Sequence, residues 1–449
     1  MKRIPNAIVH TALLTLALSA SACTDKPAAP AAAPAAAPAA APVAAAPAAA
    51  APAPVGPPAP LVELEGGKLT DGVLKIGVMT DMTGFYSDLA GPGSVMAAKM
   101  AVEDFGGKMF GKPIEVVSAD HQNKADIAST TARKWFDEDK VDVLVDLVNS
   151  GTALAVMPLA VEKRRVVLLS GPATTAITGE KCNLNTVHYT YNNWALANGT
   201  GREVVKNGGD TWFFLTADYV FGKSLEADTS AVVLASGGKV LGAVRHPQNS
   251  SDFSSFLLQA QASGAKVVGL ANAGADAVNA IKGAGEFGLT KTQSLAGLLV
   301  FISDVHSLGL AVAKGMYLTT AFYWDTDDAT RAFAKKFQSH EGNTKKAMPT
   351  MVQAGVYSET MHYLQAIKAA GTDEPEAVMA KMKATPVDDF FGKGTIGPDG
   401  LFRHDMLLVQ VKTPAESKQP WDYYKIVKRI PAAEAFPSVE VQKCPLVKK

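Results

Sequence analysis

The sequence predicts an α/β fold of two doubly wound parallel-sheet lobes, and three observations lead to it. From residue 73 onward, apolar strand-like runs alternate with segments of helical periodicity, which is typical of a parallel sheet covered by helices on both faces. The alternation occurs twice, before and after an aromatic segment at 187–199. A chain of 449 residues also exceeds one ordinary hydrophobic core. We therefore expect two packed units.

The two series of expected elements have the same form. The strands are rich in Val, Leu and Ile, as expected for strands buried on both faces. In the first series we expect strands at 73–81, 112–122, 141–150 and 166–170, and helices at 91–107, 126–139 and 152–164. In the second series we expect strands at 211–218, 239–246, 266–272 and 294–301, and helices at 224–236, 253–263 and 276–287.

The first residues predict an export signal at 1–22. Lys2 and Arg3 precede an apolar run that ends at Cys23 and is too short to span a bilayer as a stable helix. The small residues at 20–22 resemble a bacterial lipoprotein box, in which Cys23 is lipidated and becomes the mature N-terminus. They also fit ordinary signal cleavage. We expect a protein of the periplasm or cell envelope that reaches the membrane only through a lipid on Cys23.

Residues 23–72 are expected to form a tether. Pro recurs about every four residues in a run of Ala. Each Pro removes a backbone donor and clashes with the preceding helical turn, so an extended polyproline-like chain is favoured over a helix. The folded part is then expected to begin near Val73.

Charge and cysteine content narrow the classes of function. The 43 basic and 43 acidic residues cancel, and no segment concentrates Lys and Arg, which argues against a nucleic-acid partner. Besides Cys23, the sequence has only Cys182 and Cys444. In an oxidising compartment these two are expected to form a disulfide, and no His or Cys stands at ligand spacing near them to favour a metal site.

Motifs that carry catalysis or cofactor binding are missing from the sequence. It contains no P-loop, zinc-protease or nucleophile-elbow pattern, so we expect no enzyme activity, no cofactor and no metal. Residues 283–288 match the glycine spacing of dinucleotide-binding proteins, but they end an expected helix and do not connect a strand to one. Gly288 is expected to terminate that helix.

Small polar and aromatic residues gather where the expected strands end, which is where open α/β sheets bind ligands. Helices that begin at Ser or Thr present free backbone N–H groups, and these bind anions without a basic side chain. A single loop of this kind is explained as a helix cap. Five loops that face one crevice indicate a binding site; they are 80–93, 146–153, 168–175, 215–222 and 270–276.

These loops also carry a family resemblance. The segments that carry it are LKIGVMTDMTGFYSDLAGPG, VLLSGPATTAIT, FFLTADYVFGKS, AKVVGLANAG and MPTMVQAGVYSETMHYLQAIKAAGT. In these segments the chain closely resembles extracytoplasmic solute-binding proteins of ABC importers. The class that it resembles has the type I fold of the leucine/isoleucine/valine-binding protein. The resemblance covers residues 73–412 and implies two lobes joined by crossovers near 190–193, 321–324 and 386–391. Lobe 1 is then 73–191 and 322–388, and lobe 2 is 192–321 and 389–449, including a C-terminal extension.

The resemblance also implies how the ligand is held. Lobe 1 of the family binds the ligand's carboxylate through backbone and hydroxyl groups, and the matching residues are Asn149, Ser150, Pro172, Ala173 and Thr174. Amino-acid binders carry an acidic residue in lobe 2 that pairs with the ligand's ammonium, whereas this chain has Leu298 or Leu299 there. A buried ammonium without its carboxylate is strongly penalised.

We therefore expect the ligand to be a small aromatic or branched-chain carboxylate. The residues expected near its non-carboxylate part are Phe85, Tyr86, Tyr191, Trp194, Tyr219, Phe221 and Asn272. An amino acid is the alternative, with the missing acid replaced by Asp88, Asp218, Asp276 or Asp304. The expected partners of this monomer are ABC permease subunits, and a periplasmic sensor that feeds a receptor is the rival class.

Overall fold

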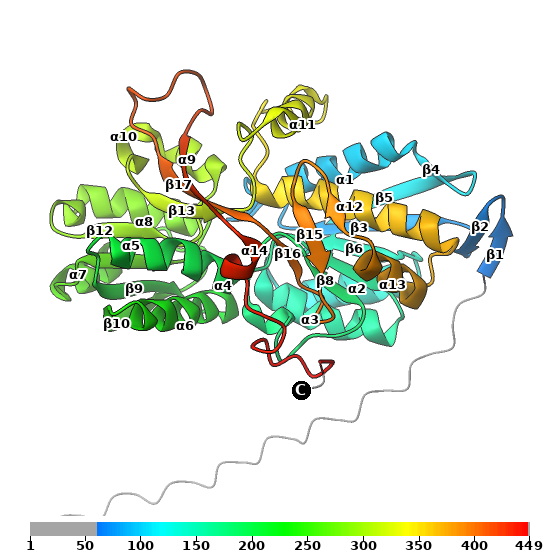
Figure 1. The fold of residues 1–449 in the computed structure, drawn as a ribbon, viewed down its shortest axis with the longest axis horizontal. Helices are drawn as coiled ribbons and strands as arrows, with labels where there is room; N and C mark the ends of the chain where they lie inside the picture. The colour runs from blue at the N-terminus through cyan, green and yellow to red at the C-terminus, as the bar shows by residue number, and fades with distance from the viewer. Residues whose placement is uncertain (1–60, 448–449) are drawn as a thin grey trace, which may run out of the picture. The chain divides into compact units, whose positions relative to one another are not determined.

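The computed structural model describes residues 61–447 (Figure 1). The expected signal peptide, the lipidation site at Cys23 and the tether up to residue 60 lie outside the described residues. Within 61–447, no helix has both the length and the apolar character needed to cross a membrane.

The folded part begins before Val73. The last residues of the expected tether form a hairpin of β1 (Leu61–Leu64) and β2 (Gly67–Thr70). Thr70 is buried, and its backbone N–H donates to Asp373 Oδ2 at 2.8 Å. The prediction of a tether to residue 72 is therefore wrong at its end. The Pro-rich run stops at Pro60, and the Leu, Val and Thr that follow favour a strand.

Lobe 1 is built on a six-stranded sheet in the order β4-β5-β3-β6-β7-β8, parallel except at its β4 edge. Its strands are β3 (Leu74–Thr80), β4 (Lys108–Met109), β5 (Lys112–Asp120), β6 (Val143–Asp146), β7 (Val166–Leu169) and β8 (Thr186–His188). Its helices are α1 (Gly91–Phe105), α2 (Ala125–Asp137), α3 (Ser150–Glu162), the 3-10 turn η1 (Thr175–Ile177), α11 (Asp328–Ser339), α12 (Met351–Ala370) and α13 (Pro375–Ala384). Helix α1 packs on α12, and α2 packs on α3.

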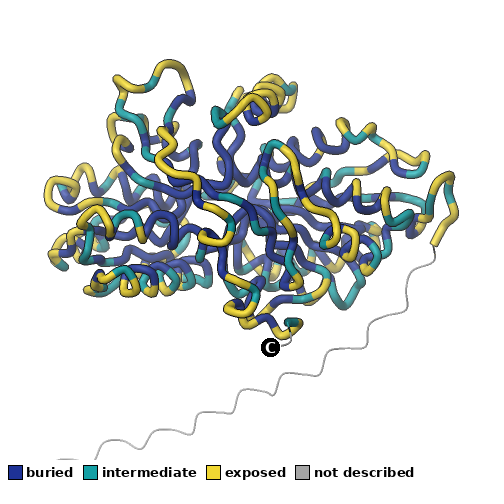
Figure 2. Tube along the Cα trace, viewed as in Figure 1, coloured by how far each residue is buried: buried dark blue, intermediate teal, exposed yellow. Residues whose placement is uncertain are grey.

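Lobe 2 has a four-stranded parallel sheet in the order β10-β9-β11-β12. Its strands are β9 (Thr211–Ala217), β10 (Lys239–His246), β11 (Val267–Ala271) and β12 (Ser294–Gly297). Its helices are α4 (Asn193–Leu196), the π-helix η2 (Ala197–Gly201), α5 (Arg202–Lys206), α6 (Val220–Ala235), α7 (Ser254–Ala262), α8 (Ala275–Glu286), η3 (Leu289–Lys291), α9 (Ile302–Leu308) and α10 (Leu310–Ala313). Gly288 follows the end of α8 in the left-handed conformation, with φ 69°. The inner strands β3, β6, β7, β9 and β11 are mostly buried, whereas β5, β10 and the outer helix faces are largely exposed or half-buried (Figure 2). The α/β fold class with two parallel-sheet lobes is confirmed.

Two short antiparallel sheets complete the fold. One consists of β13 (Tyr317–Thr320), β17 (Met406–Val411) and β18 (Tyr424–Ile430). The other consists of β14 (Val387–Asp388), β15 (Lys393–Ile396) and β16 (Phe402–His404).

The crossovers pass between these elements. Residues 190–193 lead from β8 to α4, and residues 321–324 lead from β13 to α11. The third crossover was expected at 386–391, but the turn before β16 still lies beside lobe 1, where Leu401 forms a parallel bridge with His188. The chain reaches lobe 2 only at β17, which pairs with β13. We propose that the third crossover lies between β16 and β17.

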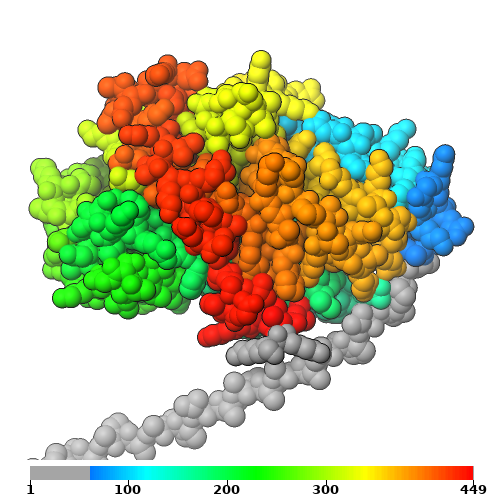
Figure 3. All heavy atoms as spheres, in the orientation of Figure 1, coloured from blue at the N-terminus to red at the C-terminus, as the bar shows by residue number. Residues whose placement is uncertain are grey.

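The C-terminal residues return to lobe 1. After β18, helix α14 (Ala432–Ala435) contacts both β16 and α4. Cys444 then forms a disulfide with Cys182, with 5.6 Å between their Cα atoms, which confirms the expected pair. In Figure 3 this segment, in red, runs over the surface between the green helices of lobe 2 and the orange β14–β16 region. It is therefore a further covalent link between the lobes.

Candidate ligand-binding site

A small pocket lies where the carboxyl ends of the strands of both lobes meet. Its lining residues are Tyr86, Leu89, Val148, Ser150, Gly171, Ala173 and Tyr191 from lobe 1 and the first crossover, and Tyr219, Phe221, Ala273, Leu299 and Phe301 from lobe 2. Its volume is about 10 Å³, which is room for about one water molecule. A small organic ligand therefore requires side chains or lobes to move apart.

Direct hydrogen bonds join the two lobes around the pocket. Asn149 Nδ2 donates to Gln248 Oε1 at 3.2 Å. The backbone N–H of Ala275 donates to the carbonyl of Phe85 at 3.0 Å. Asn149 and Phe85 are each adjacent in sequence to a lining residue, so these bonds hold the two lobes together beside the pocket.

Ser150 is the first residue of α3 and brings a hydroxyl to the pocket wall. Its Oγ accepts from the backbone N–H groups of Ala173 at 3.2 Å and Thr174 at 3.3 Å. The preceding Asn149 caps the helix, since its Oδ1 accepts from the N–H of Gly151 at 2.8 Å. Asn149 therefore positions Ser150 and does not itself line the pocket.

The loop after β7 forms the lobe 1 wall through Gly171 and Ala173. A Cβ atom at Gly171 would lie 2.5 Å from the Cα of Val148, which is closer than Cβ atoms approach backbone, so this position requires glycine. The carbonyl of Gly171 accepts from the Tyr191 hydroxyl at 2.6 Å. This bond fixes the Tyr191 ring at the pocket.

Two other predicted residues of this loop point elsewhere. The Pro172 carbonyl lies 2.7 Å from His188 Nε2 and is buried beneath the loop. Thr174 lines a separate crevice beside Val220 at the start of α6. Only the backbone N–H of Thr174 is directed toward the pocket side, where it donates to Ser150.

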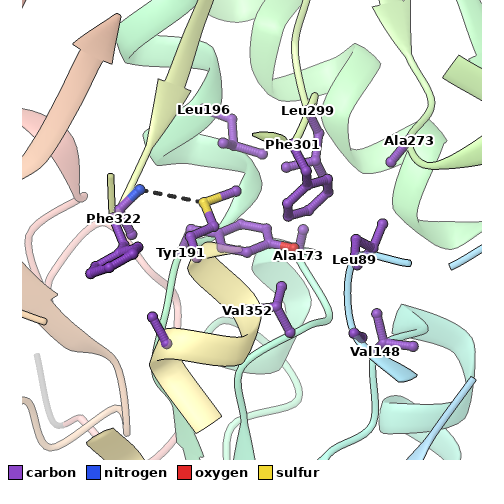
Figure 4. Packing of buried hydrophobic residues seen from close by; sticks show 14 of the residues in the cluster. Leu89, Val148, Ala173, Tyr191, Leu196, Ala273, Leu299, Phe301, Phe322 and Val352 are labelled. Atoms are coloured by element: carbon purple, nitrogen blue, oxygen red, sulfur yellow. Dashed lines mark hydrogen bonds between the residues drawn. The ribbon is translucent and has the colours of Figure 1, made fainter. Parts of the chain in front are cut away.

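The segment after β12 forms the lobe 2 wall. Leu299 and Phe301 point toward Leu89, Ala173 and Tyr191 in Figure 4. The rings of Phe301 and Tyr191 meet edge to face, with 6.4 Å between centroids. The neighbouring Leu298 is completely buried in the core and does not line the pocket. A leucine therefore stands in the wall where the resemblance had suggested an acid.

Tyr86 and Tyr219 come from opposite lobes and meet at the pocket. Their hydroxyl oxygens are 2.5 Å apart. Burial raises the pKa of both phenols above the usual value. Both groups therefore keep their protons at neutral pH.

None of the four aspartates considered as ammonium partners lines the pocket. Asp276 accepts from two backbone N–H groups of the loop after β10, at 2.8 and 3.0 Å. Asp304 accepts from the backbone N–H of Phe301 at 2.9 Å. Burial raises the pKa of Asp276 to about 6 and that of Asp304 to about 7. Asp88 and Asp218 form salt bridges with exposed lysines.

The structure brings together part of the predicted set. The predicted residues that line the pocket are Tyr86, Ser150, Ala173, Tyr191, Tyr219, Phe221 and Leu299. The expected residues that do not line it are Phe85, Asn149, Pro172, Thr174, Trp194, Asn272 and Leu298. Asn272 instead contacts His246, with its Nδ2 3.1 Å from His246 Nε2. The lining residues that the prediction missed are Leu89, Val148, Gly171, Ala273 and Phe301. Each lies within three positions of a predicted residue, so the loops were found but not the direction of every side chain.

Comparison with known proteins gives the family. Residues 73–419 match the family described as periplasmic binding protein. The chain belongs to the periplasmic binding protein family. This periplasmic binding protein is a solute-binding protein of the ABC-transporter class and is not an enzyme.

Solved structures of related periplasmic binding proteins cover almost the same length. A periplasmic binding protein from Burkholderia mallei is 54% identical, with a TM-score of 0.82, over 84% of this chain and 99% of its own. A branched-chain amino acid ABC transporter periplasmic ligand-binding protein from Burkholderia xenovorans LB400 is 41% identical, with a TM-score of 0.74. The match covers 83% of this chain and 99% of that protein. A solute-binding protein from R. palustris in complex with 4-hydroxybenzoate is 22% identical, with a TM-score of 0.73, over 81% and 98%.

Proposed function

We propose that this periplasmic binding protein captures a small aromatic or branched-chain carboxylate between its lobes for an ABC importer. In this proposal it is a monomer, anchored at a lipidated Cys23, that passes its ligand to membrane permease subunits. The observation that carries the proposal is the composition of the pocket wall. Among the described residues that line it, none is Asp, Glu, Lys or Arg, and five are aromatic.

The carboxylate end of the ligand is assigned to Ser150 and the loop after β7. The Ser150 hydroxyl and the backbone N–H groups of Ala173 and Thr174 lie together there. The N-terminus of α3 adds partial positive charge at the same place. Hydrogen bonds to a charged group contribute about 1.5–3 kcal/mol each, so a carboxylate needs no basic side chain here.

The remaining wall suits a ring or a branched chain. Leu89, Val148, Phe221, Leu299 and Phe301 present only carbon atoms from their side chains. Burial of a small apolar group contributes roughly 25 cal/mol per Å². An ammonium at Leu299 would lose its hydration without gaining a charged partner, which favours a plain acid over an amino acid.

An amino acid is the second candidate, and one observation favours it. Asp276 is close enough to Tyr86 and Tyr219 to raise the pKa of both phenols. An ammonium near the two hydroxyls would feel the same carboxylate. The 41% identical relative, named as a branched-chain amino acid ABC transporter periplasmic ligand-binding protein, fits this alternative.

A thermal-shift series with matched ligands tests the proposal. The series compares 4-methylpentanoate, its amide and leucine, and also 3-phenylpropanoate, its amide and phenylalanine. The acids are expected to raise the melting temperature and the amides to leave it unchanged. Stabilisation by the amino acids alone would overturn the proposal in favour of the second candidate.

A further inference from the structure

Among the described residues, Tyr86 and Tyr219 are the only two lining residues from different lobes that are hydrogen-bonded to each other. Tyr86 belongs to the loop after β3 in lobe 1, and Tyr219 precedes α6 in lobe 2. Tyr86 is 4% exposed. The ring of Tyr219 packs 5.7 Å from that of Phe221, and the ring of Tyr86 packs 4.2 Å from that of Phe85. The two rings are therefore held by aromatic neighbours with their hydroxyls face to face.

Hydrogen-bond accounting leaves one of these two hydroxyls with an unused proton. Each phenol carries one O–H, and both stay protonated at neutral pH. One O–H is used in the bond between Tyr86 and Tyr219, and no described residue accepts the other. The charge of Asp276 raises the pKa of both phenols, but its two oxygens accept from backbone N–H groups of another loop. The Tyr86 side chain is buried and that of Tyr219 is half-buried. A buried donor without an acceptor costs about 1–3 kcal/mol.

A second free donor lies at the carboxylate end. Ser150 Oγ accepts from Ala173 and Thr174, and no described residue accepts its own O–H. Tyr191 offers no further donor, because its O–H is used by the Gly171 carbonyl. The closed pocket thus presents two separate unused hydroxyl protons and no charged side chain.

From this arrangement we infer that the Tyr86 and Tyr219 pair donates a hydrogen bond to a second oxygen on the ligand. The preferred ligand is then an acid that also carries an oxo or hydroxyl group. The inference rests on the proposed function, because Ser150 is assigned to the carboxylate. The second oxygen accepts the spare phenol O–H. It meets that phenol only when both lobes are closed on the ligand, since the two tyrosines come from different lobes.

The same pair explains why a plain acid is the weaker ligand. An acid with only an apolar tail satisfies Ser150 but leaves the phenol O–H buried without an acceptor. A site that hydrogen-bonds a ligand group rejects the analogue that lacks this group more strongly than an apolar site rejects an extra methylene. Tyr86 and Tyr219 are therefore specificity-determining residues.

Calorimetry with matched ligands on the wild type and four variants tests this inference. The ligands are 4-methylpentanoate with 4-methyl-2-oxopentanoate, and benzoate with 4-hydroxybenzoate. The proteins are the wild type, Tyr219→Phe, Tyr86→Phe and the double variant Tyr86→Phe/Tyr219→Phe. Tyr357→Phe is the matched control, because its hydroxyl donates to Asp104 on the surface and does not reach the pocket.

In the wild type and in Tyr357→Phe, at least one oxygenated acid should bind about tenfold or more tightly than its plain partner. In the Tyr86→Phe/Tyr219→Phe double variant, which lacks both O–H groups, this ratio should fall to within about twofold, while the affinity for the plain acid changes less than about threefold. Each single variant keeps one phenol O–H without an acceptor and should therefore keep a ratio of about threefold or more. An equal loss of affinity for the oxygenated acid and for its plain partner would mean that the tyrosines hold the carboxylate itself. That result would overturn this inference but not the proposed function. A wild-type ratio near one would overturn this inference as well. No binding of any acid would overturn the proposed function with it.

Discussion

Replacing Ser150 with alanine should weaken carboxylate binding about tenfold and leave the fold intact. The Ser150 hydroxyl is the one side-chain donor at the assigned carboxylate end, and hydrogen bonds to charged groups are worth about 1.5–3 kcal/mol. Losing one such bond corresponds to about 10- to 150-fold in Kd. The substitution also releases the N–H groups of Ala173 and Thr174, now 3.2 and 3.3 Å from Ser150 Oγ, to face the ligand. Because these N–H groups partly compensate for the lost hydroxyl, we expect the loss of affinity to be near tenfold, the lower end of that range.

Calorimetry with 4-methylpentanoate and 3-phenylpropanoate measures this effect, with urea unfolding of the same samples. Ser254→Ala is the matched control, because Ser254 also begins a helix but interacts only with Asp252 at the surface. The control should bind both acids as the wild type does. An unchanged Kd for Ser150→Ala, with a stability within about 1 kcal/mol of the wild type, would refute the assignment of the carboxylate to α3.

Three further predictions concern stability and shape. Burial raises the pKa of Asp146 from 3.8 to about 7. Between about pH 4 and 7 the native state therefore keeps a proton that the unfolded chain releases. Because of this difference, the free energy of unfolding falls as the pH rises through that window. In urea-unfolding series Asp146→Asn should lose this part of the pH dependence; identical slopes for variant and wild type would argue against a buried, protonated Asp146. Reduction of the Cys182–Cys444 disulfide should lower the free energy of unfolding, measured by thermal unfolding, by about 2–5 kcal/mol. The stability of a double Cys→Ser variant should not change when reductant is added. A wild type whose stability is equally insensitive to reductant would show that the disulfide does not stabilise the fold. Gly171→Ala should cost about 1–3 kcal/mol and weaken acid binding, because its Cβ would lie 2.5 Å from the Val148 backbone; normal calorimetric affinity would show that the loop moves freely.

The strands and helices could be predicted from the sequence because their signals are local. Runs of Val, Leu and Ile bounded by small residues indicated β3, β5, β6 and β7 of lobe 1 and the four strands of the lobe 2 sheet, and their order indicated parallel sheets. The short strands β4 and β8 of the lobe 1 sheet were not predicted. The hairpin at 61–70 was missed because it follows a Pro-rich run and rests on a distant partner, Asp373. The π-helix at 197–201 was missed for a similar reason. Its Gly199 packs so closely on Thr319 that a Cβ would lie 2.1 Å from that hydroxyl, a contact invisible in the sequence.

The site could be predicted to the level of its loops and not of each side chain. Strand ends collect at one edge of a sheet, so the loops with Tyr86, Ser150 and Ala173 were expected together. Which of Leu298 and Leu299 faces the pocket depends on where β12 stops, and a strand end cannot be placed to one residue from sequence. The contact of Tyr86 with Tyr219 depends on the relative position of two lobes and has no local signal.

The most direct test of the account compares leucine with 4-methylpentanoate, the same carbon skeleton without the amino group, by calorimetry on the wild-type protein. The pocket wall has Leu299 and no lining acid among the described residues, so the account predicts that 4-methylpentanoate binds more tightly than leucine. A tighter Kd for leucine would show that a carboxylate such as Asp276 meets the ammonium, and would contradict the assignment of this site to carboxylates that lack an amino group.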